Sequence, residues 1–235
     1  MKKQLLIGVL LLATAMPLAA QDNGNLGEVI VTASRNSVDF YQDEQPVIGL
    51  RRRADSAVQL VAVTSDSRDF AMRKQEIHAM LESAIKRAGA AGVQLVTGEV
   101  TLEPMTLANY RERLFEPGNR TDTNQVSFYV KVPLGQDSTI NNAQDRIEAF
   151  IKGVPASGRS LLEKRQDMTL TIIDPDQYRD AVVKLVAAES LKYAGMFGPD
   201  YGVTVSGLHQ ELSWAQTSGT EVFLYIPYSF SILPK

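Results

Sequence analysis

Two histidines, His78 and His209, are the only imidazole side chains in this 235-residue chain, which contains no cysteine. A zinc site in a protein needs three or four ligands at characteristic spacing, and neither histidine belongs to an HxxxH or HExxH pattern. His78 also follows the apolar residue Ile77 on a predicted helix, which is typical of a histidine at the boundary of a core. We therefore expect no metal and no cofactor.

Serine chemistry is also weakly supported by the sequence. Ser157 and Ser206 each precede a glycine, but both lack the first glycine of the G-x-S-x-G turn that presents a nucleophilic serine. Asp174 and Asp176 are paired carboxylates, and helix capping explains their position. We expect no catalytic residue and a protein that is not an enzyme. An enzyme with a dispersed active site remains a further alternative.

Arg51, Arg52 and Arg53 form a run that could bind a partner. Guanidinium groups bind phosphate through paired hydrogen bonds, so the run could hold an anionic partner such as a lipopolysaccharide headgroup. Three consecutive charges are also typical of a solvated edge that prevents aggregation between strands.

The first twenty residues have the pattern of a cleavable secretory signal. Lys2 and Lys3 precede an apolar run at 5–14, and small residues end the segment at Ala20, where we expect cleavage. The mature chain then has 22 basic and 27 acidic residues, a formal charge of −5 that gives no reason to expect nucleic acid as a partner. It has no further apolar run near 18 residues, so we expect no transmembrane segment. We therefore predict a periplasmic protein, with association to the outer membrane left open.

The elements that must position these residues can be read from apolar spacing. Three segments, 69–88, 138–153 and 174–195, have the spacing of amphipathic helices. Residues 103–124 carry two prolines and a polar run and predict a long excursion. Strand patterns occur at 29–31, 47–50, 58–64, 93–102, 126–134, 168–172, 203–214 and 222–232.

This order predicts an α+β fold in which antiparallel or mixed sheets pack against about three main helices. We expect a flexible leader at 21–27 and one domain at 28–235, with two similar βαβ-type halves at 28–136 and 137–235. The last two strand segments predict an antiparallel hairpin. Because Phe223 and Tyr225 make the second face of the last strand apolar, either the chain itself or a partner subunit must cover that face.

The last sixty residues resemble the SIMPL-domain family of exported or surface-associated bacterial proteins. The resemblance rests on Pro175-Asp176-x-Tyr178-Arg179, Tyr193-Ala194-x-x-Phe197-Gly198 and Gly202-Val203-x-Val205. Upstream, Arg73-x-x-Glu76-Ile77 in a long helix also fits the family, and the likeness extends over residues 28–233. It implies an α+β fold, ring-like or channel-like homo-oligomers in some members and an association with oxidative stress. It implies no catalytic residues.

A second, local resemblance concerns the segment Glu28-Val29-Ile30-Val31-Thr32-Ala33-Ser34-Arg35, which is similar to the TonB box of outer-membrane receptors. The 215 residues of the mature chain are too few for the plug and barrel of those receptors, but a free segment could bind a partner by strand addition. Val29, Val31 and Thr32 are then candidate partner-binding residues. The alternative is an ordinary first strand.

The sequence thus predicts an exported SIMPL-like protein that self-associates and acts in envelope maintenance or protection against oxidative stress. The alternative is an envelope adaptor that offers residues 28–35 to an energy-transducing partner.

Overall fold

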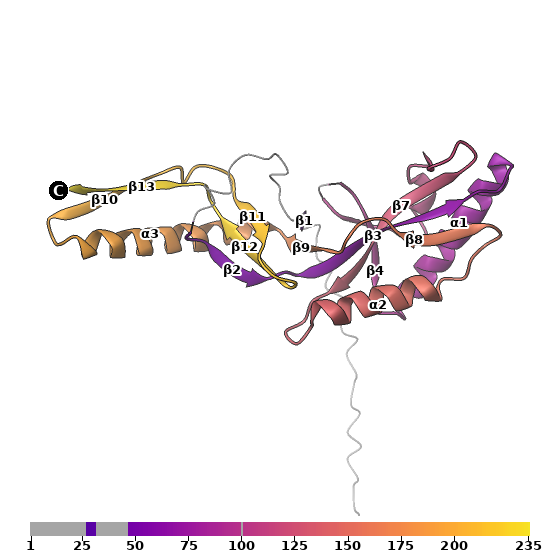
Figure 1. The fold of residues 1–235 in the computed structure, drawn as a ribbon, viewed down its shortest axis with the longest axis horizontal. Helices are drawn as coiled ribbons and strands as arrows, with labels where there is room; N and C mark the ends of the chain where they lie inside the picture. The colour runs from indigo at the N-terminus through magenta and orange to yellow at the C-terminus, as the bar shows by residue number, and fades with distance from the viewer. Residues whose placement is uncertain (1–26, 32–46, 100) are drawn as a thin grey trace, which may run out of the picture.

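The computed structural model describes residues 27–31, 47–99 and 101–235 (Figure 1). The predicted signal peptide at 1–20, Thr32 and all of the leader except Gly27 lie outside these residues. The described chain has a helix-covered body at one end, a small central sheet, and an arm that projects from the other end (Figure 1). Three α-helices and antiparallel sheets confirm the predicted α+β class.

The body contains a β-α-β-β-α-β unit whose strands share one sheet. Its elements are β3 (Ser56–Ser65), α1 (Phe70–Ala88), β4 (Gln94–Thr97), β7 (Asn124–Pro133), α2 (Ile140–Gly153) and β8 (Ser160–Lys164). Since β7 pairs with both β3 and β4, and β8 pairs with β3, the spatial order is β4-β7-β3-β8. The two βαβ-type units, β3-α1-β4 and β7-α2-β8, therefore interleave. The sheet crosses the expected boundary at residue 136.

Both helices of the body begin at capped residues and cover one face of the sheet. The Asp69 carboxylate accepts a hydrogen bond from Met72 N, and the Thr139 hydroxyl oxygen accepts one from Asn142 N. Such caps satisfy backbone donors that the first helical turn leaves unpaired. One hydrophobic core forms between the helices and the sheet, and its fully buried members include Ile77, Leu81, Val61, Phe128, Val130 and Ile147.

The opposite face of this sheet carries a small apolar cluster and a buried ion pair; the cluster consists of Val58, Val96 and Leu102. β9 (Thr169–Ile173) continues the sheet beside the first residues of β3, and β1 (Glu28–Val31) pairs with β9. The carboxylate of Glu28 binds the ammonium group of Lys131 and accepts a hydrogen bond from the hydroxyl of Thr171. Leu102 N donates to the carbonyl of Glu28, so the residue just before β5 is tied to β1.

The excursion at 103–124 folds back against the body. It contains β5 (Glu103–Pro104), the 3₁₀ turn η2 (Tyr110–Glu112) and β6 (Glu116–Pro117). The short strands pair with β4 and β7, and the Tyr110 side chain is buried against α1.

A three-stranded central sheet joins the body to the arm. Its strands lie in the order β11 (Ser213–Gln216), β12 (Glu221–Tyr225) and β2 (Leu50–Arg53). The predicted strands at 47–50 and 58–64 leave the three arginines between them, and this is wrong, because the arginines belong to β2 and pair with the apolar strand β12. Phe223 and Trp214 are buried within the chain, so this chain itself covers both faces of that part of the last strand.

The arm consists of one helix on a two-stranded ribbon. Its elements are η3 (Pro175–Tyr178), α3 (Arg179–Met196), β10 (Tyr201–Ser206) and β13 (Ser229–Pro234), and β10 pairs with β13 (Figure 1). The rings of Tyr193 on α3 and Phe230 on β13 stack with their centroids 6.1 Å apart. This contact holds the helix against the ribbon.

Each of the two long strands predicted near the C-terminus is in fact two strands. Pro227 interrupts the last one, because proline cannot donate a hydrogen bond to a neighbouring strand. Gly207 interrupts its partner with a φ of +91°, and a Cβ there would lie 2.7 Å from the carbonyl oxygen of Pro227. Only glycine suits both the conformation and the close approach. The predicted antiparallel pairing holds in both parts, as β11–β12 and β10–β13.

The start of the third helix also differs from the prediction. Asp174 has a left-handed backbone, with φ of 42°, and its side chain makes no cap hydrogen bond. The proline that follows disfavours helical backbone at Asp174, and aspartate tolerates the left-handed region. The chain therefore makes a 3₁₀ turn first, and the α-helix begins at Arg179.

Candidate functional site

The two histidines lie apart and do not form a site. His78 is half-buried on α1, with its ring 5.8 Å from that of Tyr110 in an edge-on arrangement. Burial lowers its pKa, and the positive charges of Lys74 and Arg111 lower the pKa further. His209 is exposed in the connection after β10. Among the residues that the structure describes, no three His, Cys, Asp or Glu side chains are placed to hold a metal ion.

Glu76 is the centre of a buried polar cluster that sequence analysis did not single out as a site. Its carboxylate accepts hydrogen bonds from the hydroxyls of Ser65, at 2.6 Å, and Ser67, at 2.8 Å. Burial acts to raise the pKa of Glu76, but these hydrogen bonds and the backbone of Arg159 outweigh it and lower the pKa. The ionised carboxylate accepts both hydrogen bonds, and it therefore links α1 to the end of β3.

Arg73 adds hydrogen bonds that link α1 to a third element, β7. Its guanidinium donates to the carbonyl of Ser67 at 2.7 Å and to the amide oxygen of Asn124, at the start of β7, at 2.6 Å. The Arg73-x-x-Glu76 pattern therefore places two side chains of one α1 face at the junction of β3 and β7. Its observed contacts fix the helix on the sheet, and they explain the pattern without catalysis.

Asp66 is a carboxylate whose pKa lies well below its ordinary value. Hydrogen bonds and charge from Arg159, and further contacts with Arg120, lower the pKa of Asp66 from 3.8 to about 2. The closest oxygen–nitrogen distances are 2.6 Å to Arg159 and 3.1 Å to Arg120. The three charges tie the β6–β7 turn and the α2–β8 connection to the end of β3.

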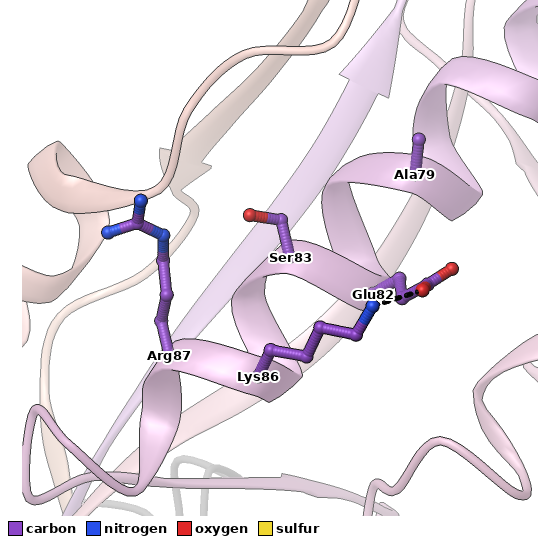
Figure 2. Close-up of a pocket in the computed structure, with 5 residues that line it drawn as sticks. All are labelled: Ala79, Glu82, Ser83, Lys86 and Arg87. Carbon is purple, nitrogen blue, oxygen red and sulfur yellow. Dashed lines mark hydrogen bonds and ion pairs between the residues drawn. The ribbon is translucent and has the colours of Figure 1, made fainter.

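A hollow of about 440 Å³ lies on the outer side of α1 (Figure 2). Figure 2 shows that the side chains around it come from this one helix, with the Lys86 ammonium group bound to the Glu82 carboxylate at 2.5 Å. The hydroxyl of Tyr110 also donates to Glu82, at 3.3 Å. Contact with Lys86 lowers the pKa of Glu82, so this carboxylate is ionised and paired. Ser83 shares the hollow, but no hydrogen bond to a base activates it in the described structure.

The three arginines predicted to bind a partner have unequal surroundings. Arg52 forms an ion pair with Asp55 at 2.7 Å and lies 4.4 Å from the ring centroid of Tyr178. Arg53 donates to the carbonyl oxygens of Gly135 and Ser138. Arg51 is exposed, with its guanidinium over the ring of Phe223. Two of the three guanidinium groups therefore hold the central sheet to its neighbours.

Val29 and Val31, the candidate residues of the TonB-box-like segment, lie in β1. Their strand pairs with β9 along its whole length, and Val31 is fully buried. β9 occupies one edge of this strand, and the bridge between Val29 and Thr101 and the hydrogen bond from Leu102 N to the Glu28 carbonyl occupy part of the other edge. Thr32 lies outside the described residues. The structure thus places the two groups of candidate residues in different sheets and does not join them into one site.

The arm carries the most conspicuous exposed surface of the described residues. Twelve large apolar side chains are exposed among the described residues, and six of them are on the arm: Leu185, Leu191, Met196, Phe197, Tyr201 and Leu233. The stripe of Val182, Val186, Ser190 and Ala194 is buried, so apolar residues also occupy sides of α3 that the ribbon does not cover. Exposed large apolar side chains that gather in one part of a protein are typical of an interaction surface.

We define the arm flank as the exposed stripe of Leu185, Ala188, Leu191 and Gly195 on α3. Its residues recur at three- and four-residue intervals, and so they lie on one side of the helix. The spacing of the third helix predicts one apolar side that consists of Tyr178, Ala181, Val182, Leu185, Val186 and Tyr193. Leu191 falls outside that side, and Leu185, which belongs to it, is 36% exposed.

Neither the comparison with protein-family models nor the search of curated proteins gives a match to this chain.

Proposed function

We propose that this chain is an exported, non-catalytic protein of the bacterial envelope that self-associates through its arm and serves envelope maintenance or protection against oxidative stress. The observation that carries the proposal is the exposed arm flank. Support for the envelope role comes from the signal-like first twenty residues and from the resemblance to the SIMPL-domain family. The three C-terminal motifs of that resemblance fall on or directly beside η3, α3 and β10, which are three of the four elements of the arm, and the upstream Arg73-x-x-Glu76-Ile77 motif falls on α1.

The flank offers Leu185 and Leu191 to another apolar surface, and the exposed Lys184 and Lys192 lie on the same side of the helix. Leu191 is 64% exposed, and burial of such a side chain contributes about 1–2 kcal/mol. The small residues Ala188 and Gly195 would let a second helix approach to about 8–10 Å between axes. A second copy of the chain supplies the same stripe, so a two-fold arrangement would bury both stripes together.

The ribbon beneath α3 offers a second kind of contact. In the described structure β10 and β13 pair only with each other, so each strand has one open edge. Open edges present unpaired backbone donors and acceptors to another chain. A subunit that docks on the flank is therefore close to a strand edge that it can extend, and the two contacts reinforce each other.

Sedimentation velocity on the mature protein tests this proposal. We expect the parent to sediment as a species of at least two chains at tens of micromolar. Leu191→Lys places a charge in the flank and should shift the protein toward the monomer. Leu114→Lys makes the same change at a leucine that is 74% exposed on the excursion, and it should leave the sedimentation unchanged. If the two variants behave alike, the flank is not the contact surface.

A further inference from the structure

The far end of the arm carries a second apolar surface, distinct from the flank. We define the arm tip as Met196, Phe197, Tyr201 and Leu233, whose side chains are 68%, 62%, 37% and 53% exposed. These residues come from the end of α3, the start of β10 and the end of β13. Figure 1 shows these ends meeting at the extremity of the arm, far from the body.

The backbone of the tip satisfies much of its own hydrogen bonding. Phe197 N donates to the carbonyl of Ala194 at 3.1 Å, and Tyr201 N donates to that of Gly198 at 3.3 Å. The Lys235 N–H donates to the carbonyl of Asp200 at 2.8 Å, which closes the turn against β13. A turn whose N–H groups are already paired loses little when water is removed from around it.

The polar groups around the tip suit an interface between water and hydrocarbon. The rings of Phe197 and Tyr201 lie 5.9 Å apart, and tyrosine has an apolar ring with a polar hydroxyl. Lys192 and Lys235 have long apolar stems that keep an ammonium group in water while the stem lies in an apolar medium. Aromatic residues and lysines of this kind are enriched at the boundaries of membranes.

The charges near the tip balance. Lys192 pairs with Glu189 at 3.2 Å, and the ammonium group of Lys235 donates to the carbonyl of Pro199, beside the exposed Asp200. Two lysines and two carboxylates therefore surround the apolar side chains. Such a surface has little electrostatic preference for anionic lipid, so its affinity should depend on apolar area.

We propose that the arm tip inserts into the interfacial region of a lipid bilayer and anchors the protein to a membrane surface by its apolar side chains. The exposed side chains of the tip offer roughly 400–500 Å², taking about 200 Å² for a fully exposed large side chain. A stable protein interface buries about 800 Å² on each partner, so the tip alone is too small for one. It is also the projecting end of a narrow arm (Figure 1), so a flat bilayer can reach it without contact to the body. This inference does not depend on self-association, which uses the flank.

Flotation with vesicles of phosphatidylcholine tests the inference on the mature chain. We expect the parent to bind, and its binding to change less than about twofold between about 0.1 and about 0.5 M sodium chloride. The double variant Met196→Ser/Phe197→Ser should bind at least about tenfold more weakly, because each side chain contributes more than one factor of ten when fully buried. The double variant Leu107→Ser/Leu114→Ser removes two exposed leucines from the body and should bind as the parent does.

Sedimentation of the same variants separates this proposal from the previous one. The tip variant should keep the parent's oligomeric state, and Leu191→Lys should keep vesicle binding. A parent that does not bind vesicles, or a tip variant that binds them as the parent does, would overturn the inference. Loss of the oligomer in the tip variant with unchanged vesicle binding would make the tip a protein contact. Binding that requires anionic lipid and disappears in salt would assign the contact to charged groups elsewhere and would also overturn the inference.

Discussion

Gly158 is the position at which one added carbon tests the packing around Glu76 most directly. Its backbone has φ of +57°, and a Cβ there would lie 2.2 Å from Oε1 and 2.6 Å from the carboxyl carbon of Glu76. The carboxylate cannot move freely, because the hydroxyls of Ser65 and Ser67 hold it. We therefore expect Gly158→Ala to destabilise the body strongly.

The magnitude follows from two contributions. The left-handed conformation costs about 1–2 kcal/mol for a residue with a Cβ. Displacement of Glu76 weakens hydrogen bonds to a charged group, each of which contributes about 1.5–3 kcal/mol. Together we expect a loss of about 3–5 kcal/mol, measured as the free energy of unfolding in urea by circular dichroism.

Two controls make this prediction specific. Gly153→Ala, at the end of α2, has nothing within 4 Å of the added carbon and should leave stability unchanged or raise it by up to about 1 kcal/mol. In a Glu76→Ala background, the cost of Gly158→Ala should fall to the conformational part, about 1–2 kcal/mol. If Gly158→Ala costs no more than Gly153→Ala, or costs the same with and without Glu76, the reasoning is refuted.

Three further predictions concern charges and processing. The folded-state pKa of Asp66 is about 2 against an ordinary 3.8, so its contribution to stability is complete above pH 3.8 and is lost as the pH falls toward 2. The urea concentration at the unfolding midpoint should therefore fall over this pH range in the parent and fall less in Asp66→Asn. An equally steep fall in both proteins would contradict this. Glu28→Ala leaves Lys131 buried without its partner and should cost about 3–5 kcal/mol of unfolding free energy, whereas a loss below about 1 kcal/mol would show that β1 is only loosely held. After expression in a Gram-negative host, mass spectrometry of the periplasmic protein should find Gln21 as the first residue; a chain that retains Met1 in the cytoplasm would exclude the signal peptide.

The parts of the fold that the sequence predicts well are those in which apolar side chains on one side alternate with more polar side chains on the other. The first two helices agree with the structure to within two residues, and the predicted strand at 126–134 corresponds to β7 at Asn124–Pro133. In β7 every second residue from Val126 to Val132 is buried under the helices. Local periodicity is sufficient for such elements, because one sheet face decides the pattern.

Elements without a clear alternation of apolar and polar residues were missed or misplaced. β8 buries Ser160 together with Leu162 and exposes Leu161, so two adjacent leucines lie on opposite sides of this strand and give no alternating signal. β2 is a strand of arginines, stabilised by pairing with β12 and by the rings of Tyr178 and Phe223. These contacts join residues more than a hundred positions apart, and local spacing contains no information about them.

The candidate surface was predictable only in part. The sequence left open whether the chain itself or a partner subunit covers Phe223 and Tyr225, and Phe223 is buried within the chain. The exposed apolar surface lies instead on α3, because the ribbon beneath it is only two strands wide and covers one side. The width of that ribbon depends on the break at Pro227, whose consequence for pairing is visible only in three dimensions.

The central claim is that the arm brings copies of this chain together, and the molar mass of the mature protein in solution tests it most directly. Light scattering over a dilution series should give at least twice the mass of one chain at tens of micromolar, with the mass falling toward one chain on dilution or on introduction of Leu191→Lys. A mass of one chain at every concentration would contradict the account.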